Sequence, residues 1–142
     1  RKTAAYQRER NVYKKRPMLA LVIAGAAVVS GGRAYANHSF AATYFEDKTQ
    51  KVEGKLVQFL FRNPHSFVQV ESEDDKGQVV RWAVEWGAGG QLGRQGVTRD
   101  TLKPGDHVII VGNPGRNPED HRLRMVNITR PSDGWKWGGS FD

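Results

Sequence analysis

The sequence predicts an all-β fold, a small five-stranded barrel preceded by an N-terminal signal segment. Short runs rich in Val, Phe and Leu are separated by Gly, Pro, Asn and Asp, and residues 78–86 alternate between apolar and polar side chains, which is typical of strands. Residues 87–106 hold six glycines and one proline, which excludes a long helix there. At 142 residues the chain is one domain in size, and without cysteine it has neither disulfides nor thiolate metal sites.

Residues 1–36 are interpreted as an N-terminal extension and a cleavable signal peptide. Three basic residues at 14–16 precede twelve apolar or small residues at 18–29, and Ala-Tyr-Ala at 34–36 has the small-x-small form that signal peptidase accepts. Twelve helical residues span about 18 Å, which is short of the roughly 30 Å hydrocarbon core of a bilayer. A cleaved signal is therefore favoured over a permanent span, and the domain 37–142 is expected to be periplasmic or secreted.

The net charge of +7 belongs to this first segment. Residues 1–36 contain eight of the 22 Lys and Arg residues but one of the 15 Asp and Glu residues, which leaves fourteen of each in residues 37–142. A neutral domain lacks the clustered basic residues that neutralise phosphates, so no nucleic-acid partner is expected. Contact with a membrane is expected only through the uncleaved signal segment.

Three strands are predicted in the first half of the domain. Residues 51–61 and 65–72 are rich in Val, Phe and Leu, and an Asn-Pro pair separates them. Residues 73–77, Glu-Asp-Asp-Lys-Gly, form a turn that leads into the third strand, residues 78–86. Glu85 shares one face of that strand with Arg81, where a solvated cross-strand ion pair is expected. The opposite face is apolar and consists of Val80, Trp82, Val84 and Trp86.

Two further strands are predicted after the glycine-rich segment. Residues 107–113 are apolar on both faces, and residues 121–130 follow a hairpin loop that contains two prolines. The tail after residue 130 places Trp135 and Trp137 among glycines, which suits either a cover for a strand edge or a flexible end.

The order of these elements predicts the architecture. Three strands, an irregular segment with room for one short helical turn at Gln91–Gln95, and two more strands match the OB-fold, a five-stranded Greek-key barrel. A small β-sandwich is the alternative. A domain of this length is large enough to bury one core.

Four segments together resemble a known family. "HSFAATY", "FRNPHSFVQVE", "WAVEWG" and "GVTRDTLKPGDHVIIVG", in this order behind a signal peptide, are similar to a family of small exported bacterial proteins known as domain of unknown function 6152. The resemblance covers about residues 37–130 and implies a secreted, all-β, OB-like domain without implying an activity. Members commonly read His-His-Ser-Phe where this chain has Asn37-His38-Ser-Phe, so a role for the first histidine is not carried over.

A metal site is predicted at the processed amino terminus. Cleavage after residue 36 would let the amine of Asn37, the amide nitrogen of His38 and its imidazole close two fused chelate rings, and such nitrogen donors suit Cu(II). The rigid Asn63-Pro64 pair presents His65 as a further ligand. The candidate metal ligands are thus Asn37, His38 and His65, and copper is the expected cofactor, with Ni(II) as the less suitable ion.

The alternative gives the histidines structural roles. His38 would be solvated, and His65 would be a turn residue whose ring bonds a backbone carbonyl. His107, after a Pro-Gly-Asp turn, and His121, at the start of the last strand, are expected to be surface turn residues.

Aromatic side chains on neighbouring strands suggest a second type of site. If they line the open face of the barrel, they would stack on a sugar or another flat ligand, as OB-folds do. The alternative is that the tryptophans of the third strand belong to the core. The candidate ligand-binding residues are Phe61, Asn63, Trp82, Glu85 and Trp86.

No recognised motif supports catalysis. The chain lacks Gly-x-Ser-x-Gly, His-Glu-x-x-His and a phosphate loop, and no sequence signal places a histidine near Glu85. The sequence therefore predicts an exported, non-catalytic binding module of unknown ligand, with copper as the candidate. An accessory subunit of a periplasmic assembly, contacting its partner through the aromatic face or the tryptophan tail, is the alternative, so the partner is an unknown periplasmic protein or a small ligand.

Overall fold

The computed structural model describes residues 40–139, and these residues form mostly β-strands. The predicted signal segment and its cleavage site lie outside the described residues. Within residues 40–139, no helix has both the length and the apolar character needed to cross a membrane. In chain order the elements are β1 (Gln50–Leu60), β2 (Phe67–Glu73), β3 (Val79–Glu85), α3 (Gly89–Arg94), β4 (His107–Pro114), the 3-10 helix η1 (Pro118–Asp120), β5 (Arg122–Arg130) and β6 (Trp135–Gly138).

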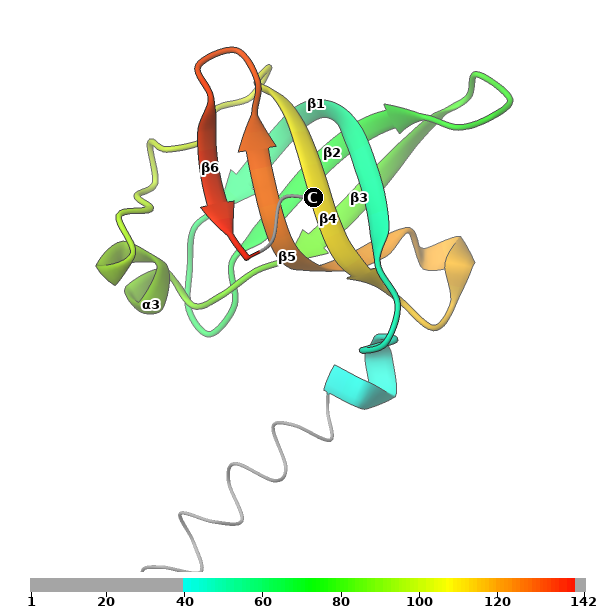
Figure 1. Ribbon diagram of the computed structural model, residues 1–142, viewed down its shortest axis with the longest axis horizontal. Helices are drawn as coiled ribbons and strands as arrows, with labels where there is room; N and C mark the ends of the chain where they lie inside the picture. Colours follow the sequence, from blue (N-terminus) through cyan, green and yellow to red (C-terminus); the bar gives the residue numbers. More distant parts are fainter. Residues whose placement is uncertain (1–39, 140–142) are drawn as a thin grey trace, which may run out of the picture. The chain divides into compact units, whose positions relative to one another are not determined.

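Five of the strands close into a barrel (Figure 1). β1, β2 and β3 form an antiparallel meander, β1 also pairs with β4, and β4 pairs with β5. A parallel pairing of β3 with β5 completes the ring. This is the strand order of the OB-fold, so the predicted architecture is confirmed and the sandwich alternative is wrong.

The predicted strands agree with the observed ones to within two residues at each end. The helical turn expected at 91–95 is α3, which lies against one end of the barrel (Figure 1). The tail forms β6 and pairs antiparallel with residues 127–130 of β5. Of the two alternatives for this tail, the cover for a strand edge is confirmed.

One strand is shared between two sides of the barrel. β1 pairs with β4 over Gln50–Lys55 and with β2 over Lys55–Leu60, with a register shift between Leu56 and Gln58. β2 and β4, the two neighbours of β1, therefore separate at Lys55. Upstream of this point, the first half of β1 runs without a partner on the β2 side, and the barrel has an open mouth there.

The core is built from alternate positions of the strands, as the period of two requires. Three residues after β3 (Leu92, Val97 and Leu102) are almost completely buried and close one end of the barrel. The remaining core residues are Val52, Leu56, Val68, Val70, Val84, Trp86, Val108, Ile110, Leu123, Met125 and Ile128.

Candidate functional site

The loop that joins β1 to β2 is tied to the end of β3. Ser66 is fully buried, its amide donates to the carbonyl of Gly87, and its own carbonyl accepts from the amide of Trp86. The Oγ of Ser66 also donates to the carbonyl of Arg62. These bonds close the loop around the cis Asn63–Pro64 bond and bring the residue before Ser66 next to the last residue of β3.

That residue is His65, and it contacts a buried carboxylate. Nδ1 of His65 lies 2.5 Å from Oε1 of Glu85, whose side chain is 10% exposed whereas that of His65 is 42% exposed. The hydroxyl of Tyr44 donates to Oε2 of Glu85 at 2.5 Å, and the guanidinium of Arg122 lies 3.6 Å from the same oxygen. Glu85 is thus surrounded by three partners from three separate parts of the chain, which we name the Glu85 cluster.

Tyr44 covers the cluster on its inner side. The residue forms a bridge to Gly115 and is 1% exposed, and the guanidinium of Arg122 lies 5.8 Å from its ring. Burial, followed by the hydrogen bond and the negative charge of Glu85, raises the pKa of the Tyr44 hydroxyl well above its usual range. Tyr44 therefore remains a proton donor to Glu85 at any physiological pH.

The Glu85 cluster holds an imidazole in one orientation at the surface. A carboxylate on Nδ1 is the arrangement that proteins use to fix the ring and raise the basicity of Nε2 for a metal ion or a proton. Because Glu85 engages Nδ1, any coordination by His65 would use Nε2. The sequence analysis placed no histidine near Glu85, whereas the structure brings His65 within hydrogen-bond distance of it.

Part of the predicted metal site is outside the described residues. Asn37 and His38 precede the first described residue, Phe40, so their part in the site stays a prediction. Among the residues that the structure describes, no three His, Asp or Glu side chains are grouped closely enough to hold a metal ion. His65 is the one predicted ligand that the structure places, and it lies half-buried beside Glu85.

The predicted ligand-binding residues do not form one surface. Trp86 is 4% exposed, and its ring packs against Phe59 and Trp137 in the core. Phe61 is half-buried against Phe59. The Oδ1 of Asn63 accepts the amide of Gly90 and so holds the start of α3 to the loop.

Trp82 is the predicted ligand-binding residue that lines a cavity. It is half-buried at the mouth of the barrel, and its ring lies edge-to-face on His121, with 5.2 Å between centroids. His121 was expected to be a surface turn residue. It lies at a turn, as the left-handed C-cap residue of η1 with φ 45°, but it is half-buried rather than fully exposed.

The solvated cross-strand ion pair expected on this face of β3 is formed by Arg81, whereas Glu85 is not solvated. Arg81 pairs with Glu71 on the neighbouring strand at 2.6 Å, and both side chains are exposed. Glu85 is buried because the chain around Tyr44 covers the end of β3. Tyr44 and Arg122 were missed by the sequence analysis. Neither carries a spacing signal that relates it to Glu85.

Comparisons with known proteins identify a family but no activity. No curated protein matches the chain. Among solved structures, the chain is similar to the crystal structure of the mitochondrial single-stranded DNA binding protein Rim1 from S. cerevisiae, with 13% identity and a TM-score of 0.44, over 60% of this chain and 94% of that one. Residues 26–124 match the family model. The chain therefore belongs to the family of unknown function DUF6152.

Proposed function

We propose that the chain is an exported, non-catalytic binding module that takes Cu(II) at its processed amino terminus, with His65 as a further ligand. The observation that carries this proposal is the bond between His65 Nδ1 and the buried carboxylate of Glu85. This bond fixes the imidazole and directs coordination to Nε2, as carboxylates behind metal-bound histidines do. The negative charge of Glu85 also favours a bound cation.

Chain length supports a shared site. Tyr44 is bonded to Glu85, and Glu85 is bonded to His65. Tyr44 lies six positions after His38, and a fully extended chain of that length reaches at most about 22 Å. Because Tyr44 and His65 both contact Glu85, this short separation supports the proposal that His38 and His65 share a metal ion.

Export is the second part of the proposal. The basic, apolar and small-x-small regions of residues 14–36 support it, because their order is that of a secretory signal. Export also gives the metal site its donors, because the amine of Asn37 exists only after cleavage. Mass spectrometry of the protein from a periplasmic fraction tests this point, and a chain that still carries residues 1–36 would contradict it.

Titration with Cu(II) tests the metal site. The chain that begins at Asn37 is expected to develop a visible d–d band at one equivalent, as four nitrogen ligands around Cu(II) produce. Acetylation of the Asn37 amine should abolish that band, because the acetylated nitrogen no longer binds the ion in the chelate. His38→Ala should have the same effect.

His65→Ala tests the further ligand, with His107→Ala as its matched control. His107 also lies beside a glutamate, 2.9 Å from Glu53, but both of those side chains are more than half exposed. We expect His65→Ala to shift the d–d band and weaken binding, and His107→Ala to leave both unchanged. Equal spectra for the two variants would remove His65 from the site, and equal binding by all amino-terminal variants would end the copper proposal.

An accessory role in an exported assembly is the alternative function. It was expected to use the aromatic face or the tryptophan tail, but Trp135 and Trp137 pack against the protein's own core. If the copper titration fails, affinity capture from a periplasmic extract would test this alternative. Recovery of no partner would then count against it.

A further inference from the structure

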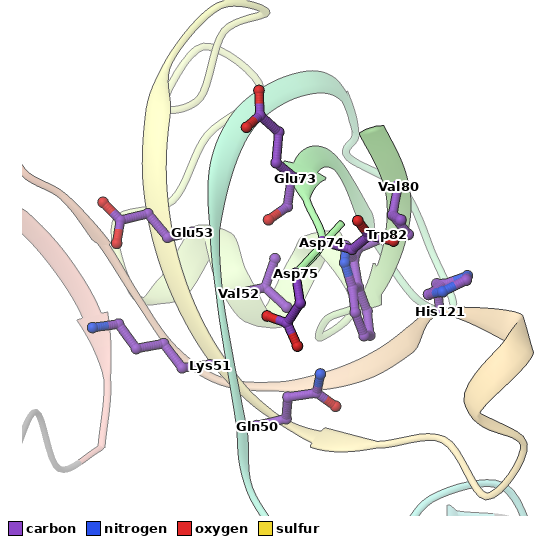
Figure 2. Close-up of a pocket in the computed structure, with 11 residues that line it drawn as sticks. Gln50, Lys51, Val52, Glu53, Glu73, Asp74, Asp75, Val80, Trp82 and His121 are labelled. Carbon is purple, nitrogen blue, oxygen red and sulfur yellow. The ribbon is translucent and has the colours of Figure 1, made fainter. Parts of the chain in front are cut away.

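A second site lies at the mouth of the barrel. A cavity of about 450 Å³ opens between the first half of β1 and the β2–β3 hairpin, and Figure 2 shows Trp82 and Asp75 on one side of β1 in this space. We propose that this cavity binds a small organic cation, an alkylammonium group with an apolar body. The proposal is independent of the copper site and uses none of its residues.

The cavity follows from the strand pairing. From Gln50 to Lys55, β1 pairs with β4 and not with β2, so a space remains open between this half of β1 and the β2–β3 hairpin. Val52 and Val80 form an apolar part of the wall, and Trp82 adds an aromatic ring. A volume of this size is in the range that holds small ligands, and barrel mouths are common places for them.

The rim of the cavity is acidic, and two of its carboxylates remain available. Oδ1 of Asp74 accepts two backbone amides of the hairpin turn, and Glu53 pairs with His107. Within residues 40–139, no hydrogen bond or ion pair engages the carboxylates of Glu73 and Asp75, which are both exposed. Lys51 and Glu53 also line the cavity, and Figure 2 shows their side chains on the other side of β1 from Asp75.

The aromatic wall is held in place. The ring of His121 lies edge-to-face on Trp82 at an interplanar angle of 82°, and the carbonyl of His121 accepts the amide of Ala83. The left-handed backbone of His121 is a conformation that non-glycine residues adopt at a cost, and such conformations cluster at ligand sites. Trp82 is thus fixed beside the acidic rim, where an aromatic ring attracts a cation.

The arrangement favours an organic cation over a metal ion. In the described part of the chain, no three side chains of the metal-ligating types converge, so the carboxylates provide a diffuse negative field. An alkylammonium group needs such a field and an apolar or aromatic contact for its body.

Choline and its uncharged isostere 3,3-dimethylbutan-1-ol are the probes for this site. The full chain is titrated with each, and the indole N–H signal of Trp82, assigned by its loss in Trp82→Phe, is followed by NMR. We expect choline to shift this signal with a Kd below about 10 mM and the isostere to bind at least about tenfold more weakly. Equal binding of the two probes, or no binding of choline in this range, would overturn the proposal.

The carboxylates are tested with a matched pair of variants. Asp75→Asn should weaken choline binding about tenfold, and Glu73→Gln should weaken it by a similar factor. Asp100→Asn removes the same charge from another exposed aspartate that lies away from the cavity, and it should change the Kd less than twofold. A loss of equal size in Asp75→Asn and Asp100→Asn would show that net charge alone attracts choline, which contradicts a site at the barrel mouth.

Discussion

The hydroxyl of Tyr44 lies 2.5 Å from the carboxylate of Glu85, a residue forty-one positions further along the chain, and both side chains are buried. Tyr44 precedes the barrel, and Glu85 is the last residue of β3. The bond therefore joins the chain that enters the domain to the strand next to His65. This contact organises the Glu85 cluster.

Glu85→Gln is expected to destabilise the fold by about 1–3 kcal/mol. The amide keeps the shape of the side chain but removes the charge that faces Arg122, and its single oxygen cannot replace both carboxylate oxygens, which contact Tyr44 and His65. Urea unfolding measures the change in the free energy of unfolding. Glu71→Gln is the control, because its pair with Arg81 is exposed and should contribute less than about 1 kcal/mol. Equal losses of unfolding free energy in both variants would mean that the buried contacts of Glu85 stabilise the fold no more than an exposed ion pair does.

The buried hydroxyl of Tyr44 predicts that the folded protein loses stability at alkaline pH. Its pKa is raised in the folded protein, so the stability it contributes is complete below the unfolded value of about 10 and is lost as the pH rises above it. Tyr44 is the only tyrosine of residues 37–142, so absorbance at 295 nm of that chain reports its ionisation alone. We expect tyrosinate to appear only as the protein unfolds. Ionisation near pH 10 with the fold intact would contradict the buried bond, and Tyr44→Phe should flatten the loss of stability above pH 10.

The strands could be predicted because their signals are local. The alternation at 78–86 and the turn at 73–77 are sequence patterns of a few residues, and the pairing of Phe67 with Glu85 follows from them. Counting residues back from that turn would have placed His65 near Glu85. The sequence thus contained a signal for the contact between His65 and Glu85.

The rest of the site could not be predicted, because it depends on contacts between distant segments. Glu85 sits at a position that alternation assigns to the solvent face, and it is buried where it contacts Tyr44, His65 and Arg122. The contact of His121 with Trp82 depends on the position of His121 at the end of η1. No periodicity or residue spacing in the sequence indicates either arrangement.

Gly54→Ala is expected to destabilise the barrel by about 1–3 kcal/mol. A methyl group on Gly54 would overlap the carbonyl oxygen of Glu71, because β1 crosses from one neighbour to the other at this point and the backbones approach closely. Gly90→Ala is the matched control, since nothing lies near its position in α3 and alanine favours a helix by about 1 kcal/mol. Thermal unfolding should show a lower Tm for Gly54→Ala and an unchanged or higher Tm for Gly90→Ala. A Tm equal to that of the unmodified protein for Gly54→Ala would mean that β1 and β2 can separate there at no cost.

Trp137→Ala tests whether the tail belongs to the fold or serves a partner. The Trp137 ring lies 4.9 Å from that of Trp86, its Nε1 donates to Oε1 of Gln95, and β6 pairs with β5. Because Trp137 is only half-buried, its removal should cost about 2–3 kcal/mol, which is less than a fully buried tryptophan costs. Gln95→Ala removes only the hydrogen bond and should cost about 1 kcal/mol. Both losses are measured by urea unfolding of the isolated protein. If Trp137→Ala left the free energy of unfolding unchanged, the ring would contribute nothing to the barrel, and a role in binding a partner would regain support.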